Sequence, residues 1–373
     1  MNSYDLKTAF EIGVEITSAN LLRLEEFPHT TDGGKWKQSR HGRWTAGFWV
    51  GLLWIPYLSS GDLHWKHEAE KWAKKLESRK FDRFTHDMGF IFQPSFVRGY
   101  SITKDEYFRN VALCACASHA SRYNSIGKFI PAWDVSEDPI FSGRTIVDTV
   151  MNLPILYWGA RNGGDTKWAE IADNVAATIR KHHVRHDGST FHVVDFDPQR
   201  GIARSYTTHQ GYAANSCWSR GQAWAIYGFS QLYGLTKNPD DLETAKRLAD
   251  YFISRLPDDV IPYWDFDAPN VPYEPKDSAS AAIAASGLLE LDRVLGGSST
   301  YASVAKEILL TLAKGYMNMD KEALNQQGIL LKGAVDVPRA SAIDESIIYG
   351  DHYFMEALFK LLYPEQWPVL LGV

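Results

Sequence analysis

The 373-residue sequence contains few cysteines and no long apolar run. Its three cysteines, Cys114, Cys116 and Cys217, are too few for a disulfide framework and are typical of a reducing compartment. No apolar run approaches the roughly 20 residues that a membrane-spanning helix needs. The N-terminus also lacks the basic stretch followed by an apolar core that marks a secretory signal. We therefore expect a soluble, cytoplasmic protein with no membrane partner.

Sequence motifs for several kinds of chemistry are also missing. The chain has no HExxH motif, no CxxC pair and no carboxylate-rich calcium loop, so we expect no metal site. It has neither a glycine-rich phosphate loop nor a GxSxG elbow, which argues against nucleotide binding and against a serine hydrolase. The formal net charge is −6 and no basic cluster is present, so nucleic acid is not an expected partner. We expect no cofactor, and nothing in the sequence indicates an oligomeric state.

What the sequence does contain is a repeated pairing of two kinds of segment, with little strand-like alternation. An apolar segment rich in small residues is followed by a turn and then by a charged amphipathic segment, which indicates stacked helix pairs. The apolar segments begin at residues 44, 86, 144, 218, 278 and 349. Their amphipathic partners lie at 6–24, 64–79, 107–123, 167–182, 241–256 and 301–317.

These six pairs predict an all-α fold, a six-hairpin (α/α) toroid barrel formed by residues 1–373 as one catalytic domain. Apolar helices would line the centre, and amphipathic helices would face water. Residues 189–196 and 261–266 do not fit the helical pattern and predict short strands or loops at the rim. The alternative is a superhelix of the same pairs that does not close.

The stretch Arg144–Trp158 is apolar on almost every side, and we interpret it as one buried helix. Arg144, Asp148 and Asn152 recur every four residues and would share one stripe of that helix. A carboxylate on a buried helix is costly unless it has partners. Asp148 is therefore either a satisfied core group or a residue that faces a cavity.

Polar and aromatic residues stand near the start of each inner segment, and in a closed ring these starts converge on one mouth. The candidate site residues are Trp44, His86, Asp87, Arg144, Asp148, Trp218, Arg220 and Trp224. Paired acids with aromatic residues are typical of carbohydrate-active enzymes, in which one acid donates a proton. The apolar surroundings of Asp148 should raise its pKa, which suits a proton donor near neutral pH.

Structural roles compete with these interpretations. Asp87 is also a favoured N-cap type, and we expect Asp277 to cap the fifth inner helix. Arg220 and Trp224, four residues apart, would form a structural cation–π pair if both lay in the core. Because residues of this kind stand at the starts of several segments that should converge at one end of the ring, a shared functional site is favoured over separate structural roles.

Longer motifs resemble those of the bacterial unsaturated glucuronyl hydrolases, essentially from end to end. They are FPHTTDGGKW near the start, WTAGFW at 44–49, HDMGF at 86–90, DTVMNLPILYW at 148–158, THQG at 208–211, WSRGQAWAIYGF at 218–229, YWDFDAP at 263–269, DSASAA at 277–282 and YGDHYFMEAL at 349–358. One departure is Ala46, which stands where that family is expected to have an aspartate.

The resemblance implies a six-hairpin barrel that releases a 4,5-unsaturated glucuronic acid from the non-reducing end of lyase-generated oligosaccharides, such as glycosaminoglycan disaccharides. The implied reaction hydrates the enol ether, with a proton delivered to C4 and water added at C5. Asp148 would be the general acid/base and Asp87 the second essential acid. The implied sugar-site residues are Trp44, Trp133, His192, Gln210, Arg220 and Trp224, with His86, Arg144 and Trp218 beside them. The alternatives are an unsaturated rhamnogalacturonyl hydrolase and a non-catalytic oligosaccharide-binding toroid.

Overall fold

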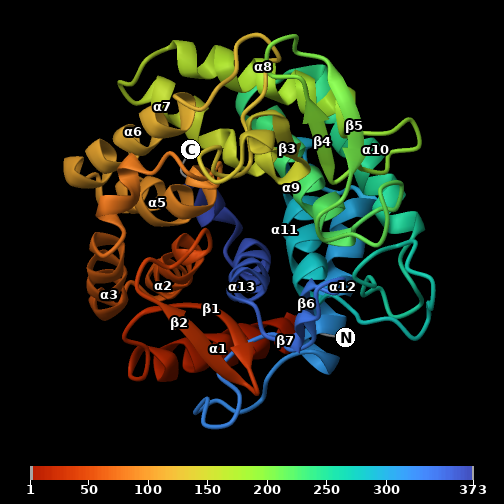
Figure 1. Cartoon of the computed structure of the whole chain (residues 1–373). Coiled ribbons are helices and arrows are strands. Elements are labelled where there is room, and N and C mark those ends of the chain that lie inside the picture. The colour runs from red at the N-terminus through yellow and green to blue at the C-terminus, as the bar shows by residue number, and fades with distance from the viewer. Residues whose placement is uncertain (1–2, 372–373) are drawn as a thin grey trace.

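The computed structural model describes residues 3–371, which form a closed ring of paired helices (Figure 1). The inner helices are α2 (Ala46–Ser60), α4 (Met88–Phe92) continued by α5 (Arg98–Thr103), α7 (Pro154–Arg161), α9 (Ser219–Thr236), α11 (Ser278–Val294) and α13 (Ile348–Leu362). The outer helices are α1 (Ser3–Leu21), α3 (Leu63–Lys74), α6 (Glu106–Ala120), α8 (Lys167–His182), α10 (Pro239–Ser254) and α12 (Thr300–Gly315). Because α13 packs against both α11 and α2, the ring closes. The six-hairpin toroid is confirmed, and the open superhelix is wrong.

The burial of each helix follows its sequence pattern. In α11 the residues from Ser278 to Leu291 are all buried, as expected for an inner helix that is apolar on every side. In the outer helix α8, the buried residues Ala172, Val175, Ala176 and Ile179 follow the spacing of one helical face. Within residues 3–371 no helix combines the length and apolarity needed to cross a membrane.

The third inner segment is not the single helix that its apolar pattern predicts. Arg144–Ile146 is strand β3, Val147–Asn152 is a 3₁₀ helix, and α7 begins only at Pro154. Proline has no N–H to donate to the preceding turn and is tolerated in the first turn of a helix, which is where Pro154 stands in α7. Arg144 pairs in a sheet instead and does not share a helical stripe with Asp148.

The second inner segment is also interrupted. Between α4 and α5, residues Gln93–Val97 form one turn of π-helix that contains Pro94. A proline inside a helix removes one main-chain hydrogen bond, which explains the change of helical type at this point. The segments that carry Asp87 and Asp148, called the two acid-bearing segments below, are therefore the two inner segments without a long regular helix.

Three small antiparallel sheets lie on the ring (Figure 1). They are β1 (Phe27–Asp32) with β2 (Lys35–Ser39), β3 with β4 (Val193–Phe196) and β5 (Ala203–Thr207), and β6 (Gly333–Asp336) with β7 (Ser341–Glu345). The expected strand within 189–196 is therefore present as β4. Residues 261–266 form no strand and contribute only isolated bridges, such as Tyr263 with Lys276. Short helical turns complete the described chain at Glu77–Phe81, Pro139–Gly143, Pro364–Gln366 and Trp367–Leu371 (α14).

Candidate active site

A cavity of about 500 Å³ opens at the end of the ring where the inner helices begin. Of the residues predicted from the sequence, its wall contains Trp44, His86, Asp87, Trp133, Asp148 and Gln210. The others do not contribute to this wall: Arg144, His192, Trp218, Arg220 and Trp224. The ring thus brings both predicted acids to one cavity, although they are 61 positions apart in the sequence.

Asp148 lies in the first turn of the 3₁₀ helix and is only 6% exposed. Its Oδ1 atom is buried and has no hydrogen-bond partner among the described residues. Burial, and then the nearby charge of Asp87, raises its pKa to about 7, while Arg220 opposes the shift. A carboxyl with this pKa holds its proton for part of the time at neutral pH and can act as a general acid.

Asp87 stands at the N-cap position of α4, but its side chain makes no capping hydrogen bond. The alternative role as a helix cap is therefore wrong. Its Oδ2 accepts a hydrogen bond from Thr85 Oγ1 at 2.5 Å, and its Oδ1 lies 3.2 Å from His86 Nε2. Burial raises the pKa of Asp87 to about 7, although the Thr85 bond and the charges of Arg122 and Arg79 act in the opposite direction.

His86 connects the two acid-bearing segments through its ring. Its Nδ1 atom lies 2.9 Å from Oγ1 of Thr149, the residue that follows Asp148, and its Nε2 atom lies near Asp87. Burial, with a smaller contribution from Arg122, lowers the pKa of His86 to about 3. The His86 imidazole is therefore neutral at pH 7. One of its nitrogens donates a hydrogen bond and the other accepts one, but the imidazole cannot supply a positive charge to a bound anion.

A layer of aromatic side chains packs behind the acids. Trp44 is stacked on Tyr349, with ring centroids 5.2 Å apart and planes at 26°, and Phe90 lies between Trp44 and Trp224 at 5.5 and 4.8 Å. Trp224 is fully buried in this layer. The alternative role of Arg220 as a cation–π partner of Trp224 is wrong, because its guanidinium lies over Trp218 at 4.5 Å and over Tyr349 at 5.4 Å.

Arg220 is held by structural contacts on the buried side of the site. Its Nη1 donates to Asp277 Oδ2 at 2.5 Å, and its guanidinium also donates to the main-chain carbonyls of Ala334 and Val335. Asp277 in turn accepts from Ala279 and Ser280 N–H groups, so the predicted cap of α11 is confirmed. Arg220 therefore joins the start of α9 to the start of α11 through the ion pair, and to strand β6 through the two carbonyl contacts.

His192 and Gln210 organise the loop at 208–211. His192 stacks on Trp218, with ring centroids 4.3 Å apart, and its Nδ1 accepts weakly, at 3.3 Å, from the main-chain N–H groups of His209 and Gln210. Burial and the neighbouring cations keep the pKa of His192 well below its ordinary value. The Gln210 amide donates to the carbonyl of Val335 at 2.8 Å. The loop is thereby attached to strand β6.

Much of the cavity wall consists of residues that were not predicted from the sequence. The additional wall residues include His29, Arg43, Arg79, Asp82, Phe84, Thr85, Asp134, Glu137, His209 and Asp336. His29 and Asp336 lie on strands β1 and β6, and most of the others lie in connections between helices, where helical periodicity gives no signal. His29 and His209 lie inside motifs that were already recognisable, and those motifs were the available signal. Among the described residues, no cluster of His, Cys, Asp or Glu is arranged to hold a metal ion.

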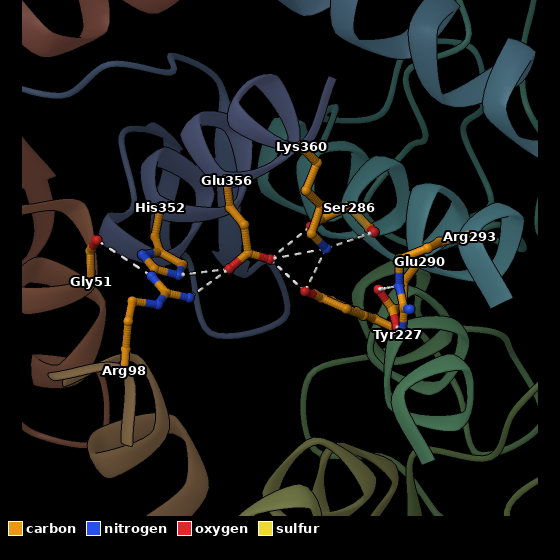
Figure 2. A network of polar contacts seen from close by, with 9 residues as sticks. All are labelled: Gly51, Arg98, Tyr227, Ser286, Glu290, Arg293, His352, Glu356 and Lys360. Atoms are coloured by element: carbon orange, nitrogen blue, oxygen red, sulfur yellow. Dashed lines mark hydrogen bonds and ion pairs between the residues drawn. The ribbon is translucent and has the colours of Figure 1, made fainter. Parts of the chain in front are cut away.

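A network of buried charges lies deeper in the barrel (Figure 2). Its centre is Glu356, seven residues after Tyr349 on α13 and so about 10 Å further along the axis. The partners of its carboxylate are Arg98, Tyr227, Ser286, His352 and Lys360. Burial raises the pKa of Glu356, but the charge of Lys360, the His352 bond and the charge of Arg98 outweigh it and hold the pKa well below the usual value.

The sequence is similar to those of known glycoside hydrolases over nearly the whole chain. Residues 19–335 match the model of Glycosyl Hydrolase Family 88. The chain is 37% identical over 356 residues to an unsaturated glucuronyl hydrolase of Bacillus sp. strain GL1, covering 93% of this chain and 94% of the relative. It is 31% identical to an unsaturated chondroitin disaccharide hydrolase of Streptococcus pyogenes serotype M1, covering 96% and 92%.

The fold comparison gives the same result. The crystal structure of the unsaturated glucuronyl hydrolase from Bacillus sp. GL1, described as responsible for the degradation of glycosaminoglycan, superposes with a TM-score of 0.90 at 35% identity. The match covers 96% of this chain and 97% of that one. With sequence, fold and a cavity containing two acids in agreement, this chain is a glycoside hydrolase and belongs to glycosyl hydrolase family 88.

Proposed function

We propose that this protein is an unsaturated glucuronyl hydrolase, which releases a 4,5-unsaturated glucuronic acid from the non-reducing end of lyase-generated oligosaccharides. The observation that carries the proposal is the pair of buried acids, Asp87 and Asp148, that face one cavity with raised pKa values. The relatives named above act, by their names, on unsaturated glucuronyl and chondroitin disaccharide substrates. Glycosaminoglycan disaccharides are therefore the first substrates to test.

In the proposed reaction, protonated Asp148 delivers its proton to C4 of the enol ether. Positive charge develops at C5 beside the ring oxygen, where the negative charge of Asp87 would stabilise it. Water then adds at C5 and returns its proton to Asp148, which completes the hydration. The resulting hemiketal opens and releases the shorter sugar. One water is consumed and the catalytic acid is regenerated, so no cofactor is needed.

The other wall residues would hold the sugar in place. Trp44 and Trp133 offer aromatic faces to the saccharide, and Gln210 and His86 offer hydrogen bonds. The remaining predicted residues, Arg144, His192, Trp218, Arg220 and Trp224, would support this wall from behind. We further propose that residues 1–373 act as one catalytic domain in a reducing compartment such as the cytoplasm, where its three unpaired cysteines would persist.

The test is the loss of ultraviolet absorbance as the alkene is consumed, measured on a panel of unsaturated disaccharides. We expect turnover of the glucuronyl substrates, with product analysis showing release of the unsaturated uronate. Turnover restricted to rhamnogalacturonan fragments would assign the sister activity instead. Tight binding of the disaccharides with no loss of absorbance would show a non-catalytic toroid.

A further inference from the structure

We propose that Asn152 is a positioning residue that sets the separation of Asp87 and Asp148, a role that rests on the proposed function. Asn152 is fully buried and stands four residues after Asp148. Its Oδ1 accepts a hydrogen bond from the main-chain N–H of Phe90 at 2.8 Å. Its Nδ2 points to the main-chain carbonyl of Asp148 at 3.5 Å. One amide thus contacts both acid-bearing segments.

These segments need such a connection because neither is anchored by a long helix. Asp87 precedes the five-residue helix α4, which changes at once to a π-helical turn. Asp148 belongs to a six-residue 3₁₀ helix that ends before Pro154. Isolated helical turns this short are not stable by themselves, so cross-links between them decide where their side chains lie.

The absence of a side chain at Gly89 permits this contact. A Cβ atom at Gly89 would lie 2.5 Å from Asn152 Cα and 2.7 Å from its Oδ1, closer than any real contact. The main chains of the two segments therefore touch directly, and the Asn152 amide closes the contact with a hydrogen bond. A second link, from His86 Nδ1 to Thr149 Oγ1 at 2.9 Å, joins the same two segments on the cavity side.

The separation of the two acids matters for the chemistry as well as for the fold. The charge of Asp87 is one of the causes that raise the pKa of Asp148. A longer separation would weaken that repulsion and lower the pKa of Asp148, which would then lose its proton at a lower pH. It would also misplace the proton donor relative to the second acid.

The experiment compares Asn152→Ala with a matched variant elsewhere. Asn318 is also buried, and its amide donates to the main-chain carbonyls of Gln326 and Gly328, outside the cavity. We expect Asn152→Ala to lower kcat roughly 10- to 100-fold with little change in KM, and to move the fall of activity with pH to lower pH. Asn318→Ala should lose stability, while its folded fraction keeps the wild-type kcat and pH profile.

A conservative variant separates positioning from mere folding. Asn152→Asp keeps an oxygen acceptor for the Phe90 N–H, so we expect it to recover most of the kcat lost in Asn152→Ala. Its extra negative charge beside Asp148 should raise that residue's pKa and move the fall of activity to higher pH. If Asn152→Ala and Asn318→Ala lose activity only in proportion to unfolding, with unmoved profiles, the positioning role is wrong. An inert wild-type enzyme would instead refute the proposed function.

Discussion

Two buried carboxylates in this barrel have opposite protonation behaviour. Asp148 at the mouth is 6% exposed, and Glu356 in the centre is 2% exposed, so both have lost nearly all contact with water. The pKa of Asp148 is raised to about 7, whereas the pKa of Glu356 is held well below its usual value. Burial by itself therefore does not decide the charge of an acid in this protein.

The difference lies in the partners of each group. Glu356 has two cations and several hydrogen-bond donors around it (Figure 2), so its charge is compensated on every side. Asp148 has an oxygen without a partner and a second acid as its neighbour. A compensated charge serves the structure, while an uncompensated acid retains its proton and is available for chemistry.

The sharpest way to test this contrast is to remove the acid at the mouth. Asp148→Asn should leave the barrel folded and able to bind oligosaccharide, but it cannot donate or accept the proton. We expect turnover to fall roughly 10²- to 10⁴-fold, measured by the absorbance of the alkene. Asp134→Asn is the control, because Asp134 lines the same cavity but has a pKa lowered by its bonds to Ser136. Near-normal turnover by Asp148→Asn would contradict the assigned role.

Removing the central charge should have the complementary effect. Glu356→Gln keeps the shape of the side chain but leaves Arg98 and Lys360 buried without their anion. We expect a loss of about 3–5 kcal/mol in the free energy of unfolding, measured with denaturant, and little change in kcat per folded molecule. Glu68→Gln, which breaks the surface pair with Lys71, should cost at most about 1 kcal/mol. Equal losses of unfolding free energy in Glu356→Gln and Glu68→Gln would show that the central charge stabilises the barrel no more than a surface ion pair does.

The pH dependence follows from the raised pKa values at the mouth. Turnover should fall about tenfold per pH unit above pH 7, because the fraction of protonated Asp148 falls. Stability should also fall as pH rises from about 4 to 7, since over this range the unfolded acids release protons that the folded pair retains. Asp148→Asn should flatten part of that stability slope. Activity that remains constant up to pH 9 would contradict the assignment of Asp148 as the acid.

The smallest expected effect concerns the aromatic wall. Trp133 is half-buried on the cavity wall, 5.3 Å from the ring of His209. Trp133→Ala should raise KM about three- to tenfold with kcat unchanged, if its face contacts the sugar equally in the ground and transition states. Tyr273→Ala, which alters a residue that is 91% exposed outside this cavity, should leave both constants unchanged. A fall in kcat alone would place Trp133 in the chemistry rather than in binding.

The helices were predictable because their signals are local. Lys167–His182 was predicted to the residue, and the inner segment expected to begin at residue 278 is observed as the helix Ser278–Val294. The exception is the segment 144–158, where apolar composition concealed a strand, a 3₁₀ helix and a proline-initiated helix. Composition reports that a segment is buried, but pairing with a distant strand such as β4 decides its conformation.

The site was predictable only in part, for a related reason. Motifs and the shared positions at inner-helix starts identified Asp87 and Asp148. The same reasoning did not distinguish wall residues such as Gln210 from supporting residues such as Arg220, because both occur in equally distinctive motifs.

The sequence by itself determined the number of helix pairs and their inner or outer position, and it proposed the two acids that line the cavity, since periodicity and motifs are local properties of the chain. The tertiary structure decided the protonation of Asp148 and completed the set of partners around Glu356. Asp148 is influenced by Asp87, which lies 61 positions earlier in the chain, whereas Glu356 combines Arg98 from a distant segment with Lys360 and His352, which lie one turn away on α13. A pKa depends on what surrounds the group in space, and only the closed ring defines those surroundings.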